Sequence, residues 1–420
     1  MWVPAYSATM HNVGSPDTGQ PLTFRQVFAV TEFRALWVAY VLSLLGDQLA
    51  RVALSVLVYA QTGSPLLTAL TYALGFLPWI VGGPLLSGLA DRFPRRTVMV
   101  VADVVRALIV GLMAVPQVPL PALLVLLFAA ELCAPPFASA RAALLPQVLD
   151  GELYVLGSAV NTITWEVTQV VGFVVAGASV AVVGARGALL VDALTFVVSA
   201  LILARWVRHR SSPVRDPGDA GGLGADLRAG LSLVFGDPWL RTLTILAWLC
   251  AAYMVPEALA APVAAREDGG ALAVGLLLAA NPIGTAIGSV LIGRWVSPER
   301  RLRWLIPMAF LCGVPLIACL WHPDLVLVGV LWGLSGLFSA YNLTANAAFV
   351  RALPDARRGQ AFGIVQAGMS VGQGVGFLIA GAAAEKIDVL TVVAFGGVVT
   401  CVAALALALT SRGRDLVRAP

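Results

Sequence analysis

The sequence predicts an all-α polytopic membrane protein, with twelve transmembrane helices in two pseudo-symmetric six-helix bundles. Three observations carry this prediction: the apolar composition, the uneven distribution of arginine along the chain, and an internal repeat. Hydrophobic residues make up 59% of the 420 residues and charged residues only 12%, whereas soluble domains average about 45–50% apolar and about 25% charged residues. Such a composition indicates a chain that lies mostly in a bilayer.

Twelve apolar runs are long enough to cross a membrane, because a spanning helix needs roughly 20 mostly apolar residues. The runs are centred near positions 46, 77, 107, 131, 169, 195, 250, 283, 311, 336, 372 and 399. The polar stretch between the sixth and seventh runs predicts a linker, in which Ala225–Phe235 is expected to form a short amphipathic helix at the membrane surface. The predicted divisions are an N-terminal tail (1–30), a first bundle (31–208), the linker (209–237), a second bundle (238–410) and a C-terminal tail (411–420).

Basic residues orient the predicted helices. Of the 27 basic residues, Lys386 is the only lysine. With the N-terminus placed in the cytoplasm, 22 arginines fall in or beside cytoplasmic segments, and the opposite side holds only Arg186, Arg266 and Lys386. Since an excess of Lys and Arg marks cytoplasmic loops, both termini are predicted to be cytoplasmic. The protein is expected to be a monomer in the plasma (inner) membrane. This asymmetry also explains the net charge of +4, so no nucleic-acid partner is predicted.

Several classes of function find no support in the sequence. Residues 1–30 lack a basic stretch followed by an apolar core, which disfavours a cleaved signal peptide. The five cysteines lie in apolar runs away from any histidine cluster, so neither a metal site nor another cofactor is predicted. A nucleotide-binding loop of the Gly-x4-Gly-Lys-Ser/Thr type is also missing, which argues against an ATP-driven pump. Nothing in the sequence predicts an enzyme.

An internal repeat relates the two predicted bundles. Val171–Gly177 matches Val375–Gly381 at an offset of 204 residues. Gly88 and the following Arg95-Arg96 match Gly293 and Arg300-Arg301 at an offset of 205. Two distant segments that share one offset indicate duplicated halves, as in transporters built from two parallel six-helix repeats.

A short charged hairpin, Gly83–Thr97, separates the second and third apolar runs. It contains Asp91, Arg92, Arg95 and Arg96 and resembles the loop between helices 2 and 3 of the major facilitator superfamily. The resemblance extends over essentially the whole chain, and its drug-exporter branch, which includes enterobactin and macrolide efflux proteins, is the most similar. The segments that carry it are Leu42–Leu49, Thr62–Pro65, Leu89–Arg96, Val255–Pro262 and Arg357–Gly363.

The chain departs from the family pattern at three positions. Ser87 and Pro94 each stand where the hairpin pattern of the family has glycine. In the fifth span, Gly172 is followed by Phe173, whereas antiporters of the family usually carry Gly-Pro. The last departure weakens the assignment as an antiporter.

The resemblance implies a secondary active transporter that works by alternating access. The leading expectation is a proton-coupled exporter (antiporter) of an amphipathic drug or secondary metabolite, with membrane lipids as further partners. Two alternatives remain open: an importer or facilitator of a small nutrient, and a membrane sensor or channel that does not transport. The resemblance also assigns a gating role to Asp91, Arg92, Arg95 and Arg96, which would pair with carboxylates and lipid phosphates when the cytoplasmic side is shut.

Ionisable groups within the spans are costly and usually functional. The candidates for proton coupling are Asp47, Arg51, Glu131 and Glu166. Asp47 and Arg51 lie one helical turn apart, a spacing that allows an ion pair between them. Such a pair would either fix the helix against its neighbours or tune Asp47 as a proton acceptor. Glu131 lies just before Pro135-Pro136, which are expected to bend the helix. For Glu166, function and helix-to-helix hydrogen bonding both remain open.

Uncharged polar groups in the spans, together with one further carboxylate, are the candidates for a substrate cavity. The candidates in the first half are amides. The second half offers mostly neutral groups at positions that correspond, through the repeat, to charged residues of the first half. The candidates are Asn161, Gln169, Glu257, Tyr341, Asn342, Asn346, Gln366 and Gln373. Asp103 and Arg106, one turn apart in the third span, are expected to have a structural role.

Overall fold

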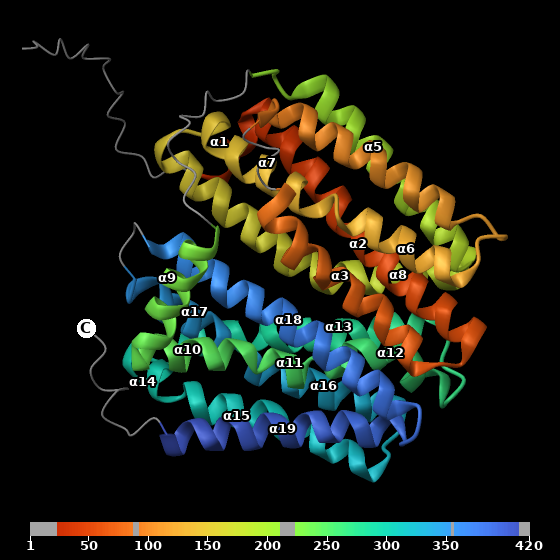
Figure 1. Ribbon diagram of the computed structural model, residues 1–420, viewed down its shortest axis with the longest axis vertical. Coiled ribbons are helices and arrows are strands. Elements are labelled where there is room, and N and C mark those ends of the chain that lie inside the picture. The colour runs from red at the N-terminus through yellow and green to blue at the C-terminus, as the bar shows by residue number, and fades with distance from the viewer. Residues whose placement is uncertain (1–22, 87–91, 211–222, 354–356, 411–420) are drawn as a thin grey trace, which may run out of the picture.

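The computed structural model describes residues 23–86, 92–210, 223–353 and 357–410, and within these ranges the chain is helical and contains no strand. The first half (red to yellow-green) and the second half (green to blue) form two bundles that lie one above the other in Figure 1. Every predicted span centre falls within a helix, so the predicted fold class is confirmed.

Seven helices belong to the described part of the first half. They are α1 (Phe24–Ala29), α2 (Thr31–Thr62), α3 (Pro65–Leu86), α5 (Arg95–Met113), α6 (Leu120–Glu131), α7 (Ala134–Val148) and α8 (Gly151–Trp206). Although α8 runs over 56 residues, Gly184 interrupts it with a φ of 74°, a backbone conformation that glycine adopts without steric cost. The fifth and sixth spans are therefore the two arms of α8.

The second half begins after the linker. Its helices are α9 (Leu223–Gly236), α10 (Pro238–Trp248), α11 (Cys250–Tyr253), α12 (Val255–Ala265), α13 (Ala271–Trp295), α14 (Pro298–Arg303), α15 (Leu305–Ile317), η1 (Ala318–Trp321), α16 (Leu325–Ser339), α17 (Tyr341–Arg351), α18 (Arg358–Ala384) and α19 (Val389–Thr410). The predicted linker helix Ala225–Phe235 is present as α9, which packs against α10 and α18.

Eight helical stretches of the described residues are long and apolar enough to cross a bilayer, and α8 is one of them. Since α8 is interrupted at Gly184, it supplies two spans. Shorter apolar stretches begin α3 and make up α15 with η1, and α5 is the charged third span. Together these segments account for the twelve predicted spans.

Proline follows the break in two of the spans, and the sequence predicted a bend in the first of them. The fourth span breaks after Glu131 and resumes as α7, whose first turn contains Pro135 and Pro136. The seventh span breaks in the same way, and Pro256 lies in the first turn of α12. Proline fits the first turn of a helix because the amide hydrogen that it lacks would have no partner there. Each break places a glutamate, Glu131 or Glu257, next to an interrupted backbone.

The two ends of the protein differ in charge. The basic end carries α1, α9 and α14 (left side of Figure 1), together with Arg95, Arg208 and Arg300. The opposite end, called the far end below, is formed by tight turns between the spans. One of these turns contains Gly63, which ends α2 with a φ of 62°; Pro65 then begins α3. A left-handed glycine followed by proline is a typical end of a helix.

The two halves meet at two seams, and each seam contains one copy of the repeat. In the first seam α8 packs against α13, and a Cβ atom added to Gly275 would lie 2.5 Å from the carbonyl oxygen of Phe173. In the second seam α18 packs against α3, and a Cβ atom added to Gly381 would lie 2.6 Å from the Cβ atom of Ala69. Small residues allow such close approach of backbones. The repeat therefore supplies equivalent contacts between the halves.

Candidate functional site

An ion pair joins α2 and α5 inside the first bundle. Asp47 Oδ1 accepts a hydrogen bond from Arg106 Nη2. Arg106 is buried, donates to Ser43 Oγ at 3.2 Å, and stacks its guanidinium 4.2 Å from the ring centroid of Phe196. Among the described residues, Asp47 forms its ion pair with Arg106, which the third span brings from 59 positions away, and not with Arg51 on its own helix.

Two more aspartates are buried near Arg106. Asp192, on the second arm of α8, is fully buried next to Gly46, where an added Cβ atom would collide with Asp192 Oδ1. Asp103 is also fully buried, and Ser199 Oγ donates to its Oδ2 at 2.6 Å. Within the described part of the chain, Asp192 Oδ2 and Asp103 Oδ1 have no hydrogen-bond partner. The environment of Arg106 is therefore rich in carboxyl groups.

A small pocket in the first bundle brings two of the predicted proton-coupling residues together. It has an empty volume of ≈ 300 Å³, open part included. Arg51 and Glu131 both line it, and so do Thr71 and Tyr72 of α3. Arg51 therefore faces Glu131 of α6 instead of Asp47 on its own helix.

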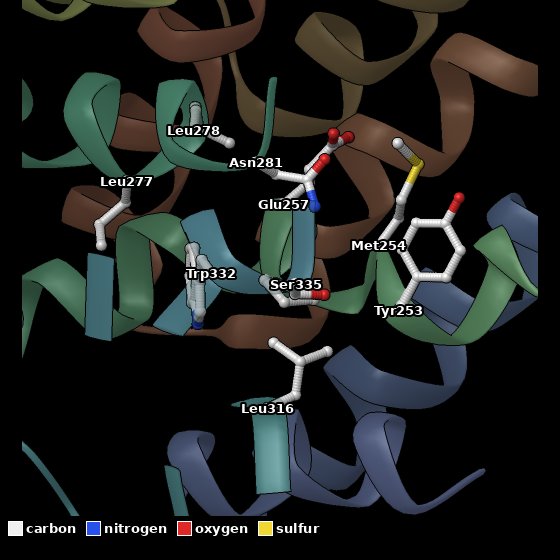
Figure 2. A pocket seen from close by; sticks show the side chains of 10 residues that line it. Tyr253, Met254, Glu257, Leu277, Leu278, Asn281, Leu316, Trp332 and Ser335 are labelled. Carbon is white, nitrogen blue, oxygen red and sulfur yellow. The ribbon is translucent and has the colours of Figure 1, made fainter. Parts of the chain in front are cut away.

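A second pocket lies inside the second bundle and has an empty volume of ≈ 270 Å³, open part included. Glu257 of α12 and Asn281 of α13 line it, and Figure 2 shows their polar ends close together. The rest of the lining is mostly apolar or aromatic, with Trp332 below Asn281 in this view. Apolar walls with a few converging polar groups are typical of small-molecule sites.

Arg51 connects the two pockets electrostatically. It acts on Glu131 in the first half and on Glu257 in the second half, and α12 packs against both α2 and α3. Glu131 in turn interacts with Asp47 and Arg106. We call the set Asp47, Arg106, Glu131, Arg51 and Glu257 the acid–base chain, because it alternates acidic and basic groups from one bundle to the other.

The polar residues of the fifth span do not join the acid–base chain. Gln169 accepts a hydrogen bond from Gln48 of α2, and it therefore helps to hold two helices of one bundle together. Glu166 is exposed and lies eleven residues, about three turns, before Gly177. Because it shares the helix face with which Gly177 meets α13, Glu166 is directed toward the second half. Asn161 lies further toward the basic end and is half-buried.

The neutral candidates of the second half divide into buried and exposed groups. Tyr341 is buried, and its hydroxyl donates to the carbonyl oxygen of Leu246 at 2.8 Å. Asn342 donates to the hydroxyl of Tyr253 at 2.8 Å, and Gln373 donates to Met254 Sδ at 2.9 Å. These three side chains hold the second bundle together around the pocket of Glu257. The other two candidates, Asn346 and Gln366, have exposed side chains.

The charged hairpin is described only in part, and Asp91 lies outside the described residues. Arg92 is exposed. Arg95 Nη1 donates to the carbonyl oxygen of Ala143 at 2.7 Å, and Arg96 donates to the carbonyl oxygen of Ala204. The two arginines therefore attach the start of α5 to α7 and α8.

Three residues of the site were not among the candidates predicted from the sequence. Arg106 is expected to be structural, whereas it is the partner of Asp47. Tyr72 is an isolated phenol in an apolar run, and only the packing of α3 shows that it borders the pocket of Arg51. Asn281 directly precedes Pro282 within an apolar run. A polar residue beside a proline, as at Glu257, is a signal that would have found it.

Known proteins share this architecture. Macrolide efflux protein A of Streptococcus pyogenes is 20% identical over 369 residues, which cover 85% of this chain and 90% of that protein. A bacterial homologue of the human lysosomal transporter Spinster, in an inward-facing and occupied conformation, superposes with a TM-score of 0.70 at 14% identity, over 92% of this chain and 97% of the other. The nucleoside transporter NupG superposes with a TM-score of 0.66 at 15% identity, over 89% of this chain and 98% of the other.

A match to a sequence profile identifies the family of this chain. The profile described as Major Facilitator Superfamily matches residues 36–263 and 253–419, and so covers nearly the whole chain. It confirms the resemblance seen in the charged hairpin and in the repeat. The chain belongs to the major facilitator superfamily, and it is a multi-pass membrane transporter.

Proposed function

We propose that this transporter is a proton-coupled exporter of amphipathic small molecules, with the basic end in the cytoplasm. The observation that carries the proposal is the acid–base chain, in which Arg51 lines a pocket with Glu131 of its own half and is close enough to Glu257 of the other half to interact with it electrostatically. An alternating-access transporter needs such a link, because its two halves must respond to each other as protons and substrate bind.

The coupling that we propose uses Arg51 as a shared cation. A buried carboxylate is stable only when it is protonated or paired. When Glu131 carries a proton, Arg51 is released toward Glu257, and the two halves are drawn together at this point. Loss of that proton returns Arg51 to Glu131 and frees Glu257 for a substrate. The ion pair of Asp47 and Arg106 keeps the other charges near Glu131 constant while Arg51 moves.

The pocket of Glu257 supports the proposed substrate class. Its apolar and aromatic walls fit the apolar part of an amphipathic molecule, and Glu257 and Asn281 provide polar contacts. Trp332 and Glu257 line the same pocket, and an aromatic ring together with a carboxylate favours a positively charged group. The space in the pocket that a water-sized sphere can occupy is ≈ 10 Å³, far below the range of about 300–1,000 Å³ that is typical of small-molecule pockets, so a drug-sized substrate requires the helices around the pocket to move apart.

One comparison supports export: the chain is similar to a macrolide efflux protein. Both seams lie near the far end, so the basic end is where this conformation admits a substrate, as a transporter of either direction requires at one stage of its cycle.

The direction of transport is tested by drug susceptibility in a host that lacks its own exporters, with a panel that includes a macrolide. Expression of the transporter is expected to raise the inhibitory concentration of at least one amphipathic compound, and Glu257→Gln is expected to abolish this protection. The matched control is Glu152→Gln, which removes an exposed carboxylate in the first turn of α8. Sensitisation of the host by the wild-type protein would instead identify an importer.

A further inference from the structure

Three turns of the second half meet at the far end, on the right side of Figure 1. They connect α12 to α13, η1 to α16 and α18 to α19, and they comprise residues 266–270, 322–324 and 385–388. Contacts of their side chains join the three turns in a ring. Glu267 Oε2 accepts a hydrogen bond from the backbone amide of Leu325, at the start of α16, at 3.1 Å. Arg266 Nη2 lies 3.5 Å from Asp388 Oδ2, and His322 Nε2 lies 3.1 Å from Asp388 Oδ1.

Asp388 is the centre of this ring of turns. Its Oδ1 also accepts hydrogen bonds from the backbone amides of Leu390 at 2.9 Å and of Thr391 at 3.3 Å. These amides belong to the first turn of α19, where a carboxylate caps the helix and interacts favourably with its dipole. Asp388 therefore ties the start of α19 to the two other turns, through Arg266 and His322.

The contact between His322 and Asp388 depends on pH, because histidine changes its charge between about pH 5 and about pH 8. A protonated imidazole forms an ion pair with a carboxylate, whereas the neutral ring contributes at most one uncharged donor. Both side chains are partly exposed, at 46% for His322 and 36% for Asp388, so protons reach them from the solvent. The contact is therefore stronger in acid, as long as the carboxylate is ionised.

The other charges near His322 stay nearly constant over this range. Arginine and lysine remain protonated, and carboxyl groups are mostly ionised. Besides His322, the three turns contain five carboxylates and two cations: Glu267, Asp268, Asp324, Glu385, Asp388, Arg266 and Lys386. Helices α15, α16 and α19 pack against η1 and contain no Asp, Glu, Lys, Arg or His. Within these described turns, His322 is therefore the group whose charge changes near neutral pH.

The backbone at His322 also indicates that its side chain is used. His322 has a φ of 51°, and Asp268 in the α12–α13 turn is the other non-glycine residue with a positive φ among those described. Glycine adopts this conformation without steric cost and is the usual residue for it at the end of a helix. Both exceptions lie in the ring of turns, where the fold accepts side chains at a cost in backbone energy.

The ring of turns reaches the first half through Glu385. Glu385 Oε1 accepts hydrogen bonds from Ser64 Oγ at 2.5 Å and from the backbone amide of Leu66 at 3.1 Å. Only two residues separate Glu385 from Asp388 in the α18–α19 turn. A shift of Asp388 therefore moves Glu385 as well.

We propose that His322 is a pH-sensitive latch of the far end. In acid, its ion pair with Asp388 holds the α18–α19 turn in the position at which Glu385 binds the first half. Toward alkaline pH the imidazole loses its charge, the turn loosens, and the far end opens more often. In the orientation proposed above, the latch responds to the pH outside the cell.

Hydrogen exchange of the purified full-length protein, read by mass spectrometry, tests the latch. It needs neither substrate nor gradient, so its result is independent of the proposed transport. Variants are compared with the wild type at about pH 5.5 and at about pH 8, on either side of the midpoint of an ordinary histidine. Comparison at equal pH cancels the pH dependence of the chemical exchange. His322→Gln removes the charge, His322→Lys makes it permanent, and His209→Gln is the control, since His209 is an exposed histidine at the basic end.

At the lower pH, His322→Gln is expected to speed exchange at the starts of α3 and α19 about threefold, a factor within the range that exposed ion pairs contribute. At the higher pH it is expected to match the wild type, whereas His322→Lys is expected to exchange more slowly. His209→Gln should behave as the wild type at both. An effect of His322→Gln that is equal at both pH values would make the contact purely structural and overturn the latch. Unchanged exchange at α3 in His322→Gln at the lower pH, or in His322→Lys at the higher pH, would also overturn it.

Discussion

Asp47 of α2 and Arg106 of α5 form an ion pair inside the first bundle although 59 positions separate them in the sequence. The pair fixes the third span to the first and places a buried guanidinium within electrostatic range of further carboxyl groups, Asp192 and Glu131 among them. Because a buried charge needs a partner, Asp47 and Arg106 each stabilise the charge of the other. Single and double substitutions can separate their roles in stability and in proton coupling.

Asp47→Asn is expected to lower the melting temperature of the purified protein, since it leaves Arg106 without its ion-pair partner. Removing one partner of a fully buried pair typically costs about 3–5 kcal/mol, and a smaller cost is expected here because the Asp47 side chain is 23% exposed. The double variant Asp47→Asn/Arg106→Gln is expected to recover part of the lost stability without recovering pH-driven transport. A double variant that melts at the temperature expected from the sum of the two single effects would show that the pair makes no net contribution.

A carboxylate at the far end connects the two halves. Glu385, just after α18, accepts hydrogen bonds from Ser64 Oγ at 2.5 Å and from the backbone amide of Leu66 at 3.1 Å. Glu385→Ala is therefore expected to speed hydrogen exchange at the start of α3, because the far end opens more often when this bond between the halves is lost. Hydrogen exchange read by mass spectrometry measures this effect.

The matched control for Glu385 is Glu267, which binds the backbone amide of Leu325 at 3.1 Å within the second half. Glu267→Ala is expected to speed exchange at the start of α16 and to leave α3 unchanged. If both variants changed α3 equally, or if Glu385→Ala left it unchanged, Glu385 would not be a connection between the halves.

The first seam is expected to tolerate no side chain at Gly275. In Gly275→Ala the new Cβ atom meets the backbone of α8 at Phe173 and Gly177, and such overpacking typically costs about 1–3 kcal/mol. We expect slower transport, because α8 and α13 no longer close at the far end. Gly293→Ala, on the same helix, is the control, since nothing lies within 4 Å of its added Cβ atom among the described residues. Equal transport rates in the two variants would contradict the role of the seam.

Much of the fold was predictable from the sequence because it depends on local signals. Apolar runs of membrane length set the spans, Pro135-Pro136 placed the break after Glu131, and the repeat identified the glycines at both seams. The break at Gly184 also follows local chemistry, since a left-handed residue ends one arm of α8.

The site was less predictable because its contacts are between distant segments. The i,i+4 spacing correctly placed Asp47 and Arg51 on one helix, yet their partners come from other helices. Tertiary packing supplies Arg106 to Asp47 and directs Arg51 toward Glu131. Tyr341 illustrates the opposite case: its phenol indicated a cavity residue, but packing uses its hydroxyl to bind the backbone at Leu246.

Proton coupling through the acid–base chain is the central claim, and transport into proteoliposomes under an imposed pH gradient tests it most directly, with a macrolide as the transported compound. The wild type is expected to concentrate the compound only when the gradient is present. Glu131→Gln and Glu257→Gln are expected to exchange it without concentrating it, whereas Glu152→Gln should behave as the wild type. Gradient-driven accumulation that is unchanged in both Glu131→Gln and Glu257→Gln would contradict the claim.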